Sequence, residues 1–176
     1  ADENIANHSL KILKRLLKAA VELKITDVVI PCVDQSSLEN RDAVDRFVKQ
    51  IARVIPIIEI ENINLSLETD LAPQPFIALL KRLNSKNITV NYDIGNSAAL
   101  GFDSDEELKA YGDRITDIHI KDRVLHGGPV ILGEGDADFD SFFNALSKID
   151  YHGPFIMQAY RDEEGISIFK SQLDWV

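Results

Sequence analysis

Two stretches of the sequence decide the fold class: ITVNYD at residues 88–93 and ITDIHIKD at residues 115–122. Apolar and polar residues alternate in both, which is the pattern of a β-strand whose side chains point alternately to two faces. One face of each strand is apolar, whereas the other is polar and carries Asp93 in the first stretch and His119 in the second. Helices cover a parallel sheet, so a persistently polar face needs a different place in the fold.

The same strand–helix unit recurs along the chain. Strand patterns lie at residues 27–33, 63–68, 88–93, 115–121 and 155–159, and helical patterns lie at residues 7–23, 44–52, 75–83, from 104 onward, 138–149 and 165–173. A helix followed by five strand–helix pairs predicts an α/β fold with a parallel sheet and right-handed crossovers. An open doubly wound sheet and part of a (β/α)8 TIM barrel both fit this order. No GxGxxG or GxxxxGK[ST] loop follows a strand, which excludes the main phosphate-loop versions of the open sheet.

Local signals refine the ends of these helices. Pro56 is expected to kink or end the helix that contains residues 44–52, because proline cannot donate a backbone hydrogen bond. Ser104 and Glu107 have the spacing of a capping box, which predicts a helix start at Ser104. The glycine-rich residues 127–135 are expected to form a loop.

The polar faces of the strands point to a metal site. The residues that share a face are Asn64, Ser66 and Glu68, then Thr89, Asn91 and Asp93, then Asp117, His119 and Lys121, and finally Ile156 and Gln158. Each set has a potential ligand at or near the carboxyl end of its strand, where barrels place functional groups. Taken singly, the acids could cap helices or turns and the histidine could be an ordinary hydrogen-bonded group. Together, two carboxylates, an imidazole and an amide oxygen predict a site for Mn2+, Mg2+, Co2+ or Zn2+.

The charge balance and the apolar content of the sequence argue against some classes of binding partner and cellular setting. Nineteen Lys and Arg residues against 29 Asp and Glu residues give a formal net charge of -10. Nucleic acid is not expected as a partner, because phosphate backbones need clustered basic residues. No apolar stretch is long enough to span a membrane and no signal-peptide core begins the chain, so neither a membrane nor secretion is expected. The single cysteine, Cys32, allows no internal disulfide and fits a cytoplasmic setting.

Five motifs make the chain resemble the xylose-isomerase-like TIM-barrel superfamily: LETD at 67–70, YDIGN at 92–96, HIKD at 119–122, LGEGD at 132–136 and GPFIMQ at 153–158. This superfamily includes sugar and sugar-phosphate isomerases and epimerases, inosose dehydratases and endonuclease IV. The resemblance implies a single domain over residues 1–176 whose strands match about the fourth to eighth of the full barrel. The first three strand–helix units would then be missing, since a full barrel takes about 250 residues. An open barrel edge would favour a homo-oligomer or other association.

The resemblance also implies roles for individual residues. Glu68, Asp93, His119 and Gln158 occupy the four metal-ligand positions of the isomerases and epimerases, and the Glu68 and Gln158 positions also hold the catalytic acid/base pair. The family has Glu where this chain has Gln158. An amide can offer an oxygen to a metal but cannot take up a proton at ordinary pH, so a symmetrical two-base mechanism is in doubt.

Three further residues are candidates for binding substrate. Asn96 is the nearest counterpart of a substrate-binding histidine that several epimerases place just after the metal-binding Asp. Arg123 could hold a phosphate or hydroxyl group, or it could be an exposed loop residue. Lys121 shares the face of His119, so it could point into the site, or it could be a solvated residue at a strand end.

The expected function is therefore a divalent-metal-dependent sugar or sugar-phosphate isomerase or epimerase. It would remove a proton next to a carbonyl and stabilise an enediolate. An inosose-type dehydratase and a catalytically inactive remnant that binds metal or sugar remain as alternatives. A phosphodiesterase like endonuclease IV is disfavoured, because the chain has only four histidines and an acidic charge balance.

Overall fold

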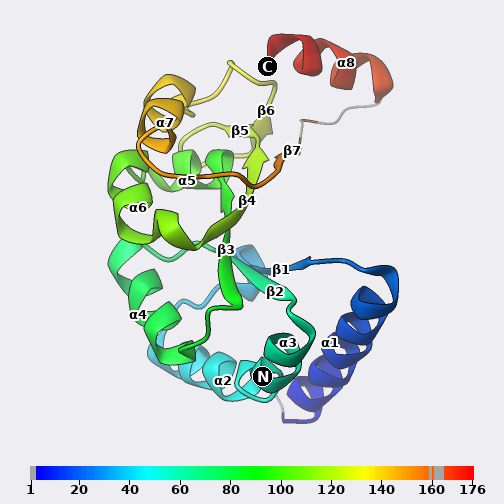
Figure 1. Cartoon of the computed structure of the whole chain (residues 1–176). Coiled ribbons are helices and arrows are strands. Elements are labelled where there is room, and N and C mark those ends of the chain that lie inside the picture. Colours follow the sequence, from blue (N-terminus) through cyan, green and yellow to red (C-terminus); the bar gives the residue numbers. More distant parts are fainter. Residues whose placement is uncertain (1–2, 159, 161–164) are drawn as a thin grey trace. The chain divides into compact units, whose positions relative to one another are not determined.

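The computed structural model describes residues 3–158, 160 and 165–176 of the 176-residue chain. The chain divides into two compact units, Ala1–Val90 and Asn91–Val176 (Figure 1). The five-stranded sheet has the order β1-β2-β3-β4-β7, and the boundary between the units falls within β3 (Ile88–Asp93). Among the described helices, none has the length and apolar character needed to cross a bilayer.

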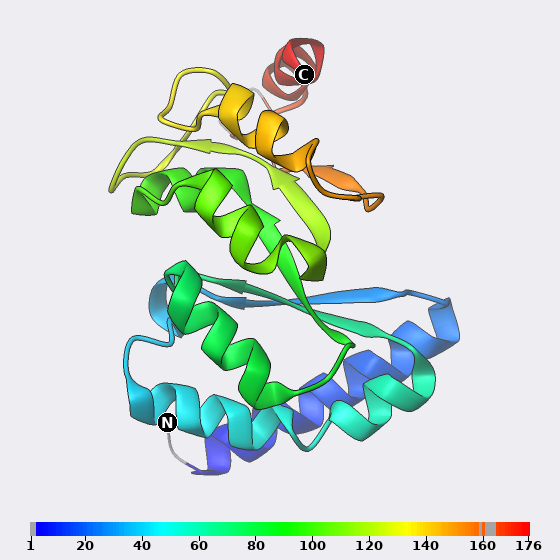
Figure 2. The same cartoon turned by 60° about the vertical axis from the view of Figure 1, so that its left-hand side comes forward.

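The first unit contains two complete strands and four α-helices. In chain order these are α1 (Glu3–Leu23), β1 (Asp27–Cys32), the 3-10 turn η1 (Asp34–Ser36), α2 (Arg41–Ile51), α3 (Ile55–Glu61), β2 (Asn64–Thr69) and α4 (Pro73–Leu83). β1 and β2 pair in parallel from Asp27 opposite Asn64 to Cys32 opposite Thr69, and β2 pairs in parallel with the first half of β3. Figure 2 shows α1 to α4 along one face of β1 and β2.

The apolar faces of these strands form the core of the first unit, as the alternating pattern predicts. Leu65 and Leu67 of β2 and Ile88 of β3 are fully buried, together with Leu17 of α1 and Ile58 of α3. Each such side chain contributes about 1.5–3 kcal/mol by leaving water. Burial of this face fixes the strand register, because a one-residue slip would exchange the two faces.

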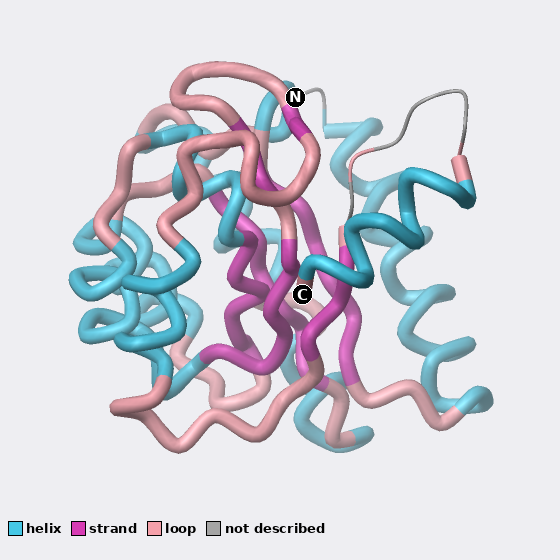
Figure 3. The backbone as a smooth tube through the Cα atoms, turned by 90° about the horizontal axis from the view of Figure 1, so that it is seen from above, coloured by secondary structure: helices cyan, strands magenta, loops and turns pink. Residues whose placement is uncertain are grey.

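The second unit continues the alternation of strands and helices. Figure 3 colours the helices cyan and the strands magenta. After the end of β3 come α5 (Ile94–Leu100), α6 (Ser104–Tyr111), the 3-10 turn η2 (Gly112–Arg114), β4 (Ile115–Ile120), β5 (Asp122–Arg123), β6 (Pro129–Val130), α7 (Phe139–Leu146), β7 (Phe155–Met157) and α8 (Ile166–Trp175). β4 and β7 pair in parallel, from Ile118 opposite Phe155 to Ile120 opposite Met157. α6 and α7 pack against each other (Figure 1).

Several local predictions were wrong. Pro56 does not kink the second helix, which ends at Ile51; it lies in the first turn of α3, where proline's missing N–H costs nothing. The helix predicted to start at Ser104 does begin there, but the predicted capping box was wrong: Asp103 is the N-cap, because its carboxylate accepts the Glu106 N–H at 2.9 Å. Residues 127–135 are not wholly loop, since β6 pairs there with β5 in antiparallel fashion. α5 was not predicted. The strand expected at 155–159 ends at Met157, and Ala159 lies outside the described residues.

Candidate metal centre

Asp93 is the last residue of β3 and the N-cap of α5. Its Oδ1 accepts the Asn96 N–H at 2.7 Å, so the helix start fixes the carboxylate. The side chain is 1% exposed, and its other oxygen, Oδ2, has no hydrogen-bond partner among the described residues. The Lys121 ammonium, 3.5 Å away, offsets part of the cost of burying this oxygen, and a bound cation would offset the rest. Asp93 therefore fits a residue that presents one oxygen to a metal ion.

His119 provides the second candidate ligand atom, near the end of β4. Its Nδ1 lies 3.5 Å from Asp93 Oδ2 and 3.3 Å from Asn91 Nδ2. Two ligand atoms at this separation can both lie about 2.1 Å from one cation, which is the bond length of Zn2+ to imidazole nitrogen and carboxylate oxygen. The predicted convergence of Asp93 and His119 is thus present in the second unit, and its oxygen and nitrogen donors suit a divalent cation.

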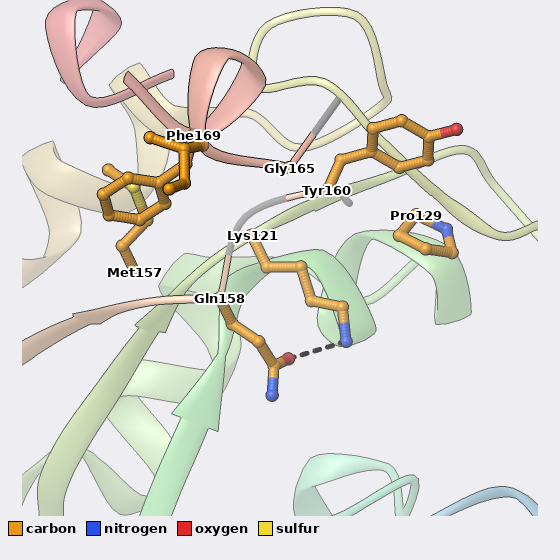
Figure 4. A pocket seen from close by; sticks show the side chains of 8 residues that line it. Lys121, Pro129, Met157, Gln158, Tyr160, Gly165 and Phe169 are labelled. Carbon is orange, nitrogen blue, oxygen red and sulfur yellow. Dashed lines mark hydrogen bonds between the residues drawn. The ribbon is translucent and has the colours of Figure 1, made fainter. Parts of the chain in front are cut away.

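Lys121 links three other predicted residues. Its Nζ lies 3.5 Å from Asp93 Oδ2 and donates hydrogen bonds to Asn96 Oδ1 at 3.3 Å and to Gln158 Oε1 at 2.8 Å. The lysine side chain is 17% exposed, so it is not a freely solvated strand-end residue. Figure 4 shows the Gln158 amide oxygen directed at the ammonium group. The role of Gln158 as a metal ligand stays a prediction.

Arg123 holds the loop after β5 against α5. Its Nε and Nη2 donate to the Gly127 carbonyl oxygen at 3.0 and 2.7 Å, and its Nη1 donates to Asn96 Oδ1 at 2.8 Å. The half-buried guanidinium is therefore ordered by two elements, unlike an exposed loop arginine. Arg123 and Lys121 place two positive charges on the same amide oxygen of Asn96.

A cavity of about 850 Å³ opens beside this group of side chains (Figure 4). Its lining residues are Lys121, Pro129, Met157, Gln158, Tyr160, Gly165, Ile166 and Phe169. Polar lysine and amide groups therefore meet mainly apolar and aromatic walls, a combination typical of small-molecule sites. Sequence reasoning missed the aromatic wall, because Tyr160 and Phe169 lie outside the strand patterns that it used.

Glu68 belongs to the first unit, as the penultimate residue of β2. It is 8% exposed and lies on the polar face that the alternation predicts. The same face carries Ser66, whose hydroxyl bonds to the Thr89 hydroxyl at 2.8 Å. Burial, together with the nearby negative charges of Asp70 and Glu68, raises the pKa of the Cys32 thiol to about 12. Glu68 is therefore a buried acid at the carboxyl end of its strand.

Asp122 is a structural residue of the site that sequence reasoning did not single out. Its Oδ2 accepts the N–H groups of Gly133 and Gly135, both at 2.9 Å, and its Oδ1 accepts the Ala137 N–H at 3.1 Å. A Cβ on Gly135 would lie 2.1 Å from Asp122 Oδ1, so only glycine allows this approach. These bonds explain why the HIKD and LGEGD motifs occur together: the carboxylate of the first fixes the loop of the second.

The whole chain, residues 1–176, matches the family described as xylose isomerase-like TIM barrel. The chain belongs to this family. Solved structures agree in fold: the zinc-bound IolI protein has a TM-score of 0.82 at 19% identity, over 98% of this chain and 70% of that one. D-allulose 3-epimerase from Methylomonas sp., in complex with D-allulose, has a TM-score of 0.76 at 22% identity, over 99% and 63%. The predicted partial TIM barrel is confirmed, and the open doubly wound sheet was the wrong alternative.

The curated relatives are named for sugar-phosphate epimerases. L-ribulose-5-phosphate 3-epimerase UlaE of Escherichia coli (strain K12) is 23% identical over 188 residues, which cover 99% of this chain and 65% of the relative. SgbU of the same organism, provisionally assigned the same activity, is 29% identical over 175 residues, or 92% of this chain and 61% of the relative. SgbU of Haemophilus influenzae is 26% identical, also over 61% of its length. The chain thus spans about three-fifths of the length of these relatives.

Proposed function

We propose that this chain carries the metal site and substrate pocket of a sugar or sugar-phosphate 3-epimerase, or of a closely related isomerase. The observation that carries the proposal is the buried Oδ2 of Asp93, which lies 3.5 Å from His119 Nδ1 and has no hydrogen-bond partner among the described residues. The names of the curated relatives support the epimerase class. Because the chain spans about three-fifths of their length, activity, substrate and partners are all part of this proposal.

The proposed ligands are Glu68, Asp93, His119 and the amide oxygen of Gln158. The first three are buried, and within the second unit Asp93 and His119 bring their ligand atoms to 3.5 Å from each other. Their oxygen and nitrogen atoms suit Mn2+, Mg2+, Co2+ or Zn2+, and the zinc in the IolI structure supports a divalent ion. When bound, such an ion supplies Lewis-acid stabilisation of negative charge on the oxygens of the substrate.

Glu68 is the proposed base, which takes a proton from the carbon next to the substrate carbonyl. Its burial fits this role, because the proton transfer would take place away from bulk water. Gln158 cannot exchange a proton, and its amide oxygen accepts a hydrogen bond from Lys121. In an isomerisation Glu68 can return the proton to the neighbouring carbon, whereas in an epimerisation the proton must reach the opposite face from water or a substrate hydroxyl, and Gln158 serves to orient groups.

Lys121, Asn96 and Arg123 are the proposed contacts for the polar end of the substrate. Two cationic groups meet at the Asn96 amide oxygen beside a cavity of about 850 Å³, which is large enough for a pentose phosphate. A phosphate would be held by charge-assisted hydrogen bonds from both groups. The sugar-phosphate name of the curated relatives agrees with this choice over a free sugar.

Exchange of the substrate's α-hydrogen in D2O with added Mn2+ tests the proposal. We expect exchange with at least one ketopentose phosphate, and we expect its loss in Glu68→Gln, which keeps shape but removes the base. His152→Ala is the matched control, because this exposed histidine pairs with Asp150 and is not one of the candidate ligands. No exchange across a panel of pentoses, hexoses and their phosphates would overturn the proposal.

The same samples discriminate the alternatives. Loss of water from an inositol-type ketone without epimerisation would indicate a dehydratase. Absence of bindable Mn2+, Co2+ or Zn2+ would indicate a remnant without catalysis. Cleavage of DNA at abasic sites would indicate a phosphodiesterase. A cytoplasmic setting, a homo-oligomer, the lack of a nucleic-acid partner and a single domain over residues 1–176 remain predictions.

A further inference from the structure

A buried carboxylate lies behind the candidate metal centre and takes no part in the proposed chemistry. Glu107 of α6 is 3% exposed. Its Oε2 accepts hydrogen bonds from Tyr92 Oη at 2.7 Å and from Ser97 Oγ, and its Oε1 accepts one from Tyr111 Oη at 2.7 Å. Hydroxyls from β3, α5 and α6 therefore meet on one side chain.

Two of these hydroxyls enclose the segment that carries the site. Tyr92 immediately precedes the candidate ligand Asp93, and Ser97 immediately follows Asn96, which contacts Lys121 and Arg123. Both ends of residues 92–97 thus bind the same carboxylate oxygen. Within the segment, Asp93 Oδ1 accepts the Asn96 N–H. One carboxylate on α6 therefore restrains the turn from strand to helix at both ends.

The opposite side of this segment is also closely packed. A Cβ at Gly95 would lie 2.9 Å from the Lys121 Cγ atom and 3.0 Å from its backbone carbonyl carbon and oxygen. The first turn of α5 therefore cannot shift toward β4 without a clash. With Glu107 on one side and Lys121 on the other, residues 92–97 have little freedom to move.

Burying the Glu107 carboxylate costs free energy that an apolar residue at the same position would not cost. Burial raises its pKa, and the hydrogen bonds from Ser97, Tyr111 and Tyr92 act against this increase. An apolar side chain would avoid the desolvation of a carboxylate. A fully satisfied polar network, however, specifies one geometry more strictly than apolar packing does. Strict geometry is what a metal ligand requires, since supporting hydrogen bonds orient the ligands.

We propose that Glu107 is a positioning residue for the metal centre: it holds both ends of residues 92–97 and so directs the Asp93 carboxylate toward His119. The inference rests on the proposed function in one respect, namely that Asp93 binds the metal ion. Loss of an interaction that orients a ligand typically lowers metal affinity about 10- to 100-fold. Glu107 therefore sets the affinity of the site without touching metal or substrate.

The test separates hydroxyls that hold the segment from one that does not. The double variant Tyr92→Phe/Ser97→Ala releases both ends of the segment and leaves Glu107 in place. Tyr111→Phe removes a hydrogen bond of the same carboxylate from α6 itself, so it is the matched control. Each 176-residue chain is titrated with Mn2+ by calorimetry, and amide hydrogen exchange over residues 93–97 is followed without metal.

We expect the double variant to bind Mn2+ about 10- to 100-fold more weakly and to exchange these amides faster, with Tyr111→Phe close to wild type in both. Equal effects of the two variants, or no effect of either, would overturn the inference. If wild type binds no Mn2+, the proposed function fails and the exchange data decide alone. Unchanged protection in the double variant would then refute the positioning role, and faster exchange would support it.

Discussion

Replacing Asp122 by Asn should destabilise the second unit measurably. The carboxylate accepts three backbone N–H groups from residues 133–137 and is 1% exposed. Hydrogen bonds to a charged group are worth about 1.5–3 kcal/mol each. An Asn in the less damaging orientation keeps its oxygen toward Gly133 and Gly135 and turns its NH2 group toward the Ala137 N–H. One bond is lost and two become neutral, which together cost about 3 kcal/mol.

The assay can use the only tryptophan of the chain. Trp175 lies against Gly133, because a Cβ there would be 2.9 Å from the indole Nε1, and its ring centroid is 5.0 Å from that of Phe139. Its fluorescence during urea unfolding therefore reports on the loop that Asp122 holds. A lower urea midpoint is expected with an unchanged slope.

The matched control is Asp113→Asn, which neutralises an exposed aspartate in the same unit. Its stability should change by no more than about 0.5 kcal/mol, as is usual for surface substitutions. A loss of less than about 1 kcal/mol in Asp122→Asn would refute the reasoning, because the three N–H groups would then not depend on the charge. An equal loss in both variants would attribute the effect to net charge instead.

Three other outcomes are expected. Gly135→Ala should lower the free energy of unfolding by about 1–3 kcal/mol in urea titration, because its methyl group would lie 2.1 Å from Asp122 Oδ1. The control Gly128→Ala has open space around the new methyl group and should match wild type. Equal urea midpoints of the two variants would contradict the packing argument. His119→Ala should weaken Mn2+ binding more than about 100-fold by calorimetry with unchanged circular dichroism, because a direct ligand exceeds the effect of a supporting one; retained affinity would remove His119 from the site. Burial raises the pKa of Cys32 to about 12, so its thiol should resist a disulfide reagent at pH 8 until urea unfolds the chain. The free energy of unfolding should also fall between about pH 9 and 12, because the thiol ionises at lower pH in the unfolded chain than in the folded one. Rapid reaction of the native chain with the reagent would refute this.

The alternation of polar and apolar residues was sufficient to predict the strands of the five-stranded sheet and the convergence of Asp93 with His119, but not the short pair β5 and β6. Both features depend on local geometry, since side chains on a strand point to two faces in turn. Ser66 and Thr89 confirm the same rule on neighbouring strands of the first unit, with a hydroxyl–hydroxyl bond of 2.8 Å. The face to which each strand residue points could be predicted from sequence, because it does not depend on which helices cover the sheet.

The start of α6 shows where local patterns fail. Asp103 and Ser104 are both good N-cap residues, and Ser104 has Glu107 at the spacing of a capping box. The structure uses Asp103, because Glu107 turns inward to accept the Tyr92 and Ser97 hydroxyls. Tertiary contacts with β3 and α5 decide between two caps of similar strength, so no local signal could have predicted the choice.

The HIKD motif contains residues whose direction the strand alternation predicts and one whose direction depends on tertiary contacts. β4 ends at Ile120, so His119 still follows the strand parity, and Lys121 continues it far enough to reach Asp93. Asp122 is the first residue whose direction the parity does not govern, and it anchors the loop that ends at Ala137. The ligand was predictable from periodicity and the anchor was not, although they are three residues apart. Up to the end of a strand, local geometry fixes the direction of each side chain, and beyond it the rest of the unit does. In this chain the candidate site contains residues of both kinds, so the sequence could predict only some of them.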